Sequence, residues 1–169
     1  MTITAVASTG QAEAEQLAAE LRETSHEVEF PDHSAGSEGD DWVLLSDMTD
    51  PFRAGNNCHA ATWAVLAHVT ERLGLDLGQD IHAVEVLFTD GCHWFPAFTA
   101  TDGTIWALDP TTRQFHDSAP FLSATPLTQH LFDVYRWVAE GFRDRAVSVT
   151  INGVPRLDLL PVSTATQNT

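Results

Sequence analysis

The sequence predicts an α+β fold in which one central helix packs on an antiparallel sheet. Three observations indicate this fold: an apolar run long enough for a buried helix, three β-rich runs divided by tight-turn residues, and a second helix pattern with one apolar face. The chain has 169 residues, which is enough for one domain but too few for two full ones. We therefore expect a single compact core.

The central helix is predicted over residues 58–73, which read CHAATWAVLAHVTERL. Alanines and large apolar residues occupy most positions of its first three turns, so nearly all of that surface can be buried. Gly74 follows directly and is typical of a helix C-terminus. The large apolar residues of this run are Trp63, Val65, Leu66, Val69 and Leu73.

Three β-rich runs follow the helix, and the residues between them predict antiparallel pairing. The runs are 83–88 (AVEVLF), 92–99 (CHWFPAFT) and 104–108 (TIWAL). Asp-Gly pairs at 90–91 and 102–103 separate them, and Asp-Gly is typical of tight hairpin turns. We expect His93 on the second of these strands and Asp109 at the end of the third. Four aromatic residues of these runs are expected to form the core or the walls of a cleft: Trp94, Phe95, Phe98 and Trp106.

Two further patterns complete the expected domain. Thr125 as N-cap and Pro126 at the first helical position begin a second amphipathic helix, which is expected to end at Gly141. Asn152-Gly153 then predicts a final hairpin between AVSVTI and VPRLDLL. The apolar face of the second helix comprises Leu127, Leu131, Val134, Tyr135 and Val138.

The N-terminal part of the chain is predicted to lie outside the core. Residues 11–23 have helix composition, whereas residues 31–41 mix proline, glycine, serine and acidic residues. We assign residues 1–41 to a peripheral helix and an acidic linker, 42–162 to the single domain and 163–169 to a frayed tail. The acidic side chains of the linker are expected to be solvated. They are Asp32, Glu38, Asp40 and Asp41.

Charge and composition exclude several kinds of partner. The chain has 24 acidic residues against 8 basic ones, and its formal net charge of -16 would repel nucleic-acid phosphates and anionic lipid headgroups. The sequence shows neither a signal-peptide pattern nor a run near the roughly 20 apolar residues of a membrane span. We therefore expect a cytoplasmic protein that binds neither nucleic acid nor membranes, while export of an effector by another route stays open.

Three residues together predict a site of thiol chemistry. Cys58 is expected at the start of the central helix, where the amides and dipole of the first turn stabilise a thiolate. An imidazole such as that of His93 can take the thiol proton and later deliver it to a leaving group. A carboxylate such as that of Asp109, placed behind the imidazole, fixes its tautomer.

The hairpin between the last two strands decides whether His93 and Asp109 share a face of the sheet. A two-residue turn at 102–103 would direct Asp109 away from His93. A three-residue loop over 101–103, with its glycine left-handed, pairs Phe95 with Asp109 and makes Asp109 the diagonal neighbour of His93. We predict the three-residue loop.

The motifs around these residues read RAGNNC at 53–58, GCHWF at 91–95 and GTIWALDPT at 103–111. They resemble the transglutaminase-like branch of the papain-like cysteine enzymes, over about residues 50–112. The resemblance implies a papain-like or transglutaminase-like catalytic domain with a catalytic triad of Cys58, His93 and Asp109. The Asn-Asn-Cys element is closer to papain-fold toxins that deamidate glutamine, so an effector of that type is an alternative.

The reaction that follows from the resemblance is acyl transfer from an amide or thioester to Cys58. The expected substrate is an amide of a peptide or protein, or a small-molecule amide or thioester, and the expected outcome is hydrolysis or glutamine deamidation. Transamidation and a catalytically inactive interaction module of the same fold are alternatives. The oxyanion donors are expected to be the Cys58 backbone N–H with the side chain of Asn56 or Asn57, or the indole of Trp42.

The sequence predicts neither a cofactor nor a bound metal. Cys-His pairs at 58–59 and 92–93 suggest a zinc site, but neighbouring side chains diverge by about 100° on a helix and about 180° on a strand. We therefore expect His59 on the helix surface. Cys92 is expected to pack on the opposite side of its strand from His93.

Overall fold

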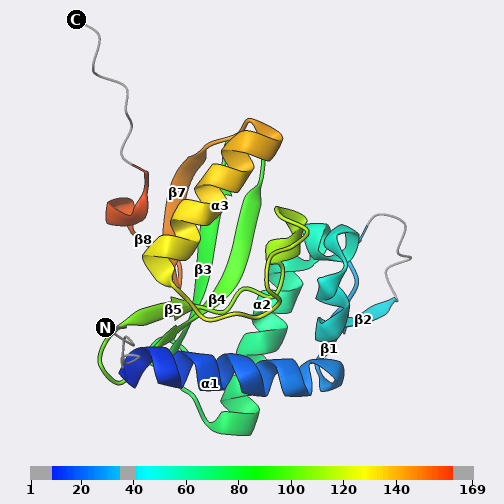
Figure 1. The fold of residues 1–169 in the computed structure, drawn as a ribbon, viewed down its shortest axis with the longest axis vertical. Coiled ribbons are helices and arrows are strands. Elements are labelled where there is room, and N and C mark those ends of the chain that lie inside the picture. The colour runs from blue at the N-terminus through cyan, green and yellow to red at the C-terminus, as the bar shows by residue number, and fades with distance from the viewer. Residues whose placement is uncertain (1–8, 35–40, 162–169) are drawn as a thin grey trace, which may run out of the picture.

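A six-stranded antiparallel sheet organises the fold, and its strand order is β6-β5-β4-β3-β7-β8 (Figure 1). The computed structural model describes residues 9–34 and 41–161. A separate two-stranded sheet pairs β1 with β2. The α+β prediction is confirmed. The helices are α1 (Thr9–Thr24), α2 (Pro51–Leu73) and α3 (Leu127–Phe142), and the strands are β1 (Glu29–Pro31), β2 (Trp42–Leu44), β3 (Ile81–Phe88), β4 (Cys92–Thr99), β5 (Ile105–Ala107), β6 (Thr125–Pro126), β7 (Ala146–Ile151) and β8 (Val154–Pro155).

The β4–β5 hairpin has the predicted three-residue loop. Gly103 has a φ of 82°, in the left-handed region, and the Ala100 N–H donates to the carbonyl oxygen of Thr104 at 2.9 Å. Ala97 pairs with Ala107 in the resulting register. Continued by two residues, the same register brings Asp109 beside β4 on the face that carries His93.

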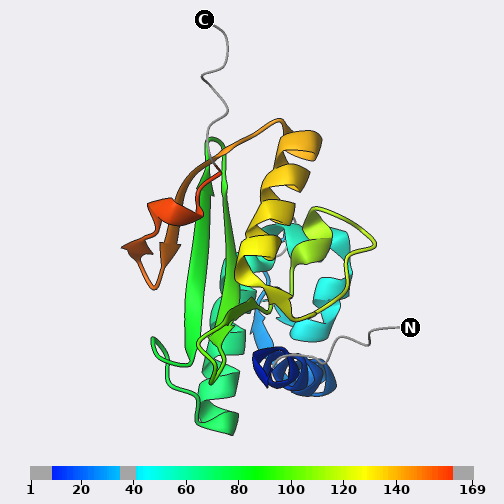
Figure 2. The same cartoon turned by 60° about the vertical axis from the view of Figure 1, so that its left-hand side comes forward.

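The pleat of the sheet divides the core between two faces. Val84, Val86 and Phe95 pack against α3, which lies across the strands in Figure 1. Ile81 and Phe98, which have the opposite parity, pack with α1 and α2. Figure 2 shows α3 beside the sheet and α1, seen nearly end-on, beside the lower part of the sheet. Because His93 has the parity of Phe95, its side chain points toward α3.

The N-terminal helix α1 belongs to the core, so the prediction that it is peripheral is wrong. Its buried residues join the same hydrophobic cluster as those of α2. The N–H of Gly10 also donates to the Asp102 carboxylate at 3.0 Å, which connects α1 to the β4–β5 loop. The buried apolar residues of this helix are Ala14, Leu17, Ala18 and Leu21.

Helix α2 begins at Pro51, seven residues before the predicted start. The Asp50 side chain caps it by accepting the N–H of Phe52 at 2.9 Å, and proline at the first position suits a helix start. Cys58 therefore lies about two turns inside the helix. Helix geometry directs its N–H to the carbonyl of Ala54, so this N–H is not available to an oxyanion.

The second predicted helix also has different ends. Residues Thr125–Pro126 form strand β6 against β5, and α3 starts only at Leu127. At its other end the helix passes Gly141 and stops where Arg143 adopts a left-handed φ of 54°. The helix thus runs one residue past the predicted end, and its last turn lies beside the β3–β4 turn.

The C-terminal hairpin forms at the predicted turn, where Asn152 and Gly153 have φ values of 50° and 77°. Its second arm is strand only at β8 and continues as a short 3₁₀ turn. The predicted tail at 163–169 lies outside the described residues. Within residues 9–34 and 41–161, no helix is both long enough and apolar enough to cross a membrane.

Asp32 is buried rather than solvated, because it accepts several hydrogen bonds. Its Oδ1 accepts from the side-chain amide of Asn57 at 2.8 Å and from the Ser34 hydroxyl at 2.6 Å. Arg53 lies 3.6 Å from its Oδ2. Asn57, itself fully buried, accepts the N–H of His33 at 2.8 Å. These hydrogen bonds connect the segment after β1 to Asn57 of α2, the residue before Cys58.

Of the other acidic residues of the predicted linker, the structure describes only Asp41. Asp41 is exposed, as expected. Glu38 and Asp40 lie outside the described residues.

Replacing Asn57 by alanine should therefore destabilise the fold, because it removes the hydrogen bonds that the buried Asn57 amide makes with Asp32, with Ser34 and with the N–H of His33. We expect Asn57→Ala to lower the free energy of unfolding by about 1–3 kcal/mol. The neighbouring Asn56 is exposed, and Asn56→Ala should change it by less than about 0.5 kcal/mol. Urea denaturation of both variants measures the difference, and equal effects would contradict the buried role of Asn57.

Candidate active site

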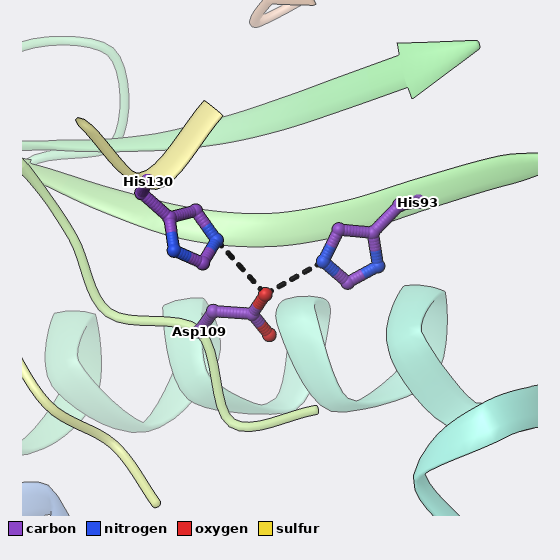
Figure 3. A group of neighbouring side chains, drawn as sticks. All are labelled: His93, Asp109 and His130. Carbon is purple, nitrogen blue, oxygen red and sulfur yellow. Dashed lines mark hydrogen bonds and ion pairs between the residues drawn. The ribbon is translucent and has the colours of Figure 1, made fainter. Parts of the chain in front are cut away.

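Two imidazoles share one buried carboxylate at the centre of the molecule (Figure 3). The Nε2 of His93 lies 2.6 Å from Oδ2 of Asp109, and the Nε2 of His130 lies 3.0 Å from the same oxygen. The other oxygen, Oδ1, accepts the N–H of Thr111 at 2.8 Å and its hydroxyl at 3.0 Å. An ionised carboxylate only accepts hydrogen bonds, so the Nε2 atoms of both histidines carry a hydrogen.

Three separate elements bring these side chains together. His93 lies on β4, Asp109 follows β5 by two residues, and His130 lies in the first turn of α3. Figure 3 shows the three side chains converging in the space between the sheet and the helices. Phe95 packs its ring against that of His130, with the centroids 4.6 Å apart. The imidazoles are therefore held by aromatic contacts as well as by hydrogen bonds.

The site holds an ionised acid and a protonated imidazole. Burial alone would lower the pKa of His93, but the charge and hydrogen bond of Asp109, with a smaller contribution from Cys58, raise it to about 10. Burial would likewise raise the pKa of Asp109, but the two imidazoles hold it far below its usual range. The buried pair is thus charged at neutral pH.

The Cys58 thiol lies in the same electrostatic environment. Burial would raise its pKa, yet the hydrogen bond and charge of His93 and the backbone N–H of Trp94 bring it below the ordinary value. Strand β5 pairs with β4 only from Ala97 to Thr99, so the edge of β4 at Trp94 is open. Helix α2 occupies this open edge, which is why a strand N–H can reach the cysteine.

Of the side chains predicted as oxyanion donors, one is buried and already hydrogen-bonded, and two are exposed. The Asn57 amide already donates to Asp32, to Ser34 and to the carbonyl of Arg53. The other two candidate side chains, those of Asn56 and Trp42, are exposed. Trp42 lies on β2, in the small sheet. Asn57 is therefore structural.

Gln114 is a site residue that the sequence reasoning missed. Its side-chain nitrogen lies 3.1 Å from Nδ1 of His93, the ring nitrogen that does not face Asp109. The same nitrogen donates to the carbonyl of Thr111 at 3.1 Å. Gln114 lies five residues beyond Asp109 in a short 3₁₀ turn, where no periodic pattern marks it. The only available signal was its closeness in sequence to the Asp-Pro-Thr motif.

His93, Asp109 and His130 are also the described residues best placed to hold a metal ion, since their ligand atoms lie within 4.8 Å of one another. Ligands at the usual 2.0–2.1 Å from a tetrahedral ion lie about 3.3 Å apart. The 2.6 Å between His93 and Asp109 is shorter than that and suits a hydrogen bond. The geometry therefore favours a hydrogen-bonded group over a metal site.

A cavity of about 430 Å³ lies beside the site. Gln114 lines it, as do Gly55, one helical turn before Cys58, and Cys92, next to His93. The prediction that Cys92 is packed away is therefore wrong, since this residue is exposed in the cavity wall. The remaining lining residues are Phe88, Asp90, Gly91, Phe115, Val138, Phe142 and Asp144.

The other aromatic and histidine predictions near the site are confirmed. His59 is exposed on α2, with its ring centroid 4.9 Å from that of Trp94. Phe95, Phe98 and Trp106 are buried in the core, and Trp94 is half-buried and packs against it.

Comparison with models of known protein families, with curated proteins and with solved structures finds no match to this chain. The fold and the site geometry are therefore the basis for any functional conclusion.

Alkylation of Cys58 should show whether His93 activates it. In a Cys92→Ser background, iodoacetamide should label Cys58 with a pH midpoint below the ordinary thiol value of about 8.5. His93→Ala should raise this midpoint, because only the Trp94 backbone N–H then opposes the effect of burial. His59→Ala removes an exposed imidazole beside Cys58 and should leave the midpoint unchanged. Mass spectrometry of the native protein gives the rates, and a Cys58 that reacts only after unfolding would contradict activation.

The raised pKa of His93 should also appear in the stability of the fold. Because the pKa of His93 is higher in the folded state, protonated His93 stabilises the fold. This stabilisation is fully present below about pH 6.5 and is lost as the pH rises toward about 10. Both cysteines are replaced by serine, so that no thiol titrates in this window. The free energy of unfolding should then fall by up to about 1.4 kcal/mol per pH unit, and adding His93→Gln should remove this slope. Urea denaturation between pH 6 and 10 measures it, and parallel curves would show an ordinary His93 pKa.

Proposed function

We propose that this protein is a cysteine-nucleophile enzyme that acts on an amide bond through an acyl-enzyme. One observation carries the proposal: His93 lowers the pKa of the Cys58 thiol while its Nε2 lies 2.6 Å from Asp109. A thiol, an imidazole and a carboxylate in this order are the parts of nucleophilic catalysis. The sequence resemblance to transglutaminase-like and papain-like enzymes points to the same three residues.

The reaction begins when the Cys58 thiolate attacks the carbonyl carbon of the substrate amide. A C–S bond forms and the carbonyl oxygen takes the negative charge. His93 then gives its Nδ1 proton to the amide nitrogen, the C–N bond breaks, and an amine or ammonia leaves. In the second half, His93 takes a proton from water, the hydroxide oxygen attacks the thioester, and the carboxylic acid leaves as Cys58 is regenerated.

Two donors beside the thiol are candidates for stabilising the oxyanion. The Trp94 backbone N–H already reaches the Cys58 sulfur, so a carbonyl oxygen bound there would find a fixed donor. The Gln114 side chain, beside His93 Nδ1, carries the second. These two replace the Cys58 N–H, which is occupied within the helix. Asn56 is exposed on α2 two residues before Cys58, and helix geometry turns side chains at this spacing to nearly opposite sides of the helix.

Release of ammonia from a glutamine side chain and hydrolysis of a peptide bond use the same steps and differ only in the leaving group. The proposal covers both, and it includes the effector-type glutamine deamidase as a special case. Transfer to an amine requires that an amine replace water in the second half.

Acyl-enzyme trapping tests the proposal directly. Incubation with p-nitrophenyl acetate should acetylate Cys58 as a thioester that neutral hydroxylamine removes, which mass spectrometry detects. Release of ammonia or amine from glutamine peptides and peptide amides should be lost about 10³-fold or more in Cys58→Ser and in His93→Ala. In Cys92→Ser, which removes the other cysteine, p-nitrophenyl acetate should still acetylate Cys58.

Two results would contradict this proposal. Turnover that survives Cys58→Ser would exclude Cys58 as the nucleophile. A folded protein whose Cys58 is never acylated would be the inactive interaction module.

A further inference from the structure

The cavity beside the candidate site has several apolar side chains in its wall. Phe88 at the end of β3 and Val138 of α3 are buried, and Phe115 lies with its ring centroid 6.2 Å from that of Phe142. The cavity's volume of about 430 Å³ is within the range of small-molecule and side-chain pockets, roughly 300–1,000 Å³. Phe142 is 62% exposed, so part of the aromatic wall is open to a ligand. The cavity can therefore hold an alkyl chain or a ring.

Negative charge gathers at one wall of this cavity. Asp90, in the β3–β4 turn, and Asp144, just after α3, both line it. The Asp144 carboxylate is fixed by the backbone N–H groups of Thr89, Asp90 and Arg145 at 3.1, 3.0 and 2.7 Å.

The C-terminus of α3 adds to this negative potential, because it ends at the same wall and its carbonyl groups carry partial negative charge. Among the described residues that line the cavity there is no lysine or arginine. Arg143 and Arg145 flank Asp144 in sequence but do not line the cavity.

We propose that this cavity binds the substrate residue next to the scissile amide, and that the residue it takes is a basic one, arginine or lysine, of a peptide. The alkyl stem would pack on the aromatic wall, and the cation would face Asp90 and Asp144. Aromatic faces beside a carboxylate suit a cation better than a neutral or an acidic group. The overall charge of -16 also draws basic peptides toward the protein. This inference deepens the proposed function and rests on it for the scissile bond, but the binding itself does not require catalysis.

Binding can be measured without any turnover, because Cys92 lines the cavity. In Cys58→Ser, Cys92 is the only cysteine of the chain, and a ligand in the cavity should shield it from iodoacetamide. Butylguanidine and butylurea have the same shape, and only the first is charged. We expect butylguanidine to slow the alkylation of Cys92 about threefold or more at concentrations above its dissociation constant, and butylurea to have little effect.

Asp90→Asn should abolish this protection. Glu140→Gln removes the same charge from an exposed position of α3 outside the cavity and should preserve it. Equal protection by butylurea and butylguanidine would overturn the charge selectivity, and no protection by either would overturn the cavity as a binding site. These protection experiments do not depend on whether Cys58 can be acylated.

In the enzyme with Cys58 intact, peptide amides with arginine beside the scissile bond should react at least about tenfold faster than matched citrulline peptides. Asp90→Asn should reduce this ratio and Glu140→Gln should not. Turnover without an arginine preference would overturn the inference and leave the proposed function standing. Cys92 protection without turnover would leave the pocket standing and refute the proposed function.

Discussion

The buried negative charge of Asp109 is the interaction on which the rest of the site depends. A carboxylate removed from water must have its acceptor positions filled, or the fold loses several kcal/mol. Here Oδ2 accepts from His93 and His130, and Oδ1 accepts twice from Thr111, so all four acceptor positions are used. The charge thereby holds β4, α3 and the loop after β5 in one arrangement.

Because all acceptor positions of Asp109 are used, only certain proton transfers are possible at this site. Asp109 has no free lone pair and a strongly lowered pKa, so it orients His93 without taking its proton. The Nε2 of His93 is committed to the carboxylate, so in the proposed reaction Nδ1 is the nitrogen that exchanges a proton with Cys58 and the substrate. The side-chain nitrogen of Gln114 lies 3.1 Å from this Nδ1. His130 shares the carboxylate oxygen and acts as a positioning residue.

The sequence was sufficient for the parts of the site set by local rules. The Asp102-Gly103 turn, with its left-handed glycine, determined the β4–β5 register and hence the meeting of His93 with Asp109. The sequence was insufficient for the parts of the site where contacts join segments that are distant along the chain. His130 reaches Asp109 only because α3 lies across the sheet. Asp32 is buried although its segment has almost no apolar residues, because Asn57 and Ser34 supply its hydrogen bonds.

The largest difference from the sequence expectation concerns how the thiolate is stabilised. A cysteine in the first turn of a helix would use the helix dipole, but that effect fades within one turn, and Cys58 lies about two turns inside α2. Its pKa is still lowered, by His93 and by a strand N–H at the open edge of β4. The short β5 exposes this edge, since a longer strand would pair with Trp94 and consume its N–H. The length of β5, rather than the start of α2, is therefore what provides a backbone donor to the sulfur.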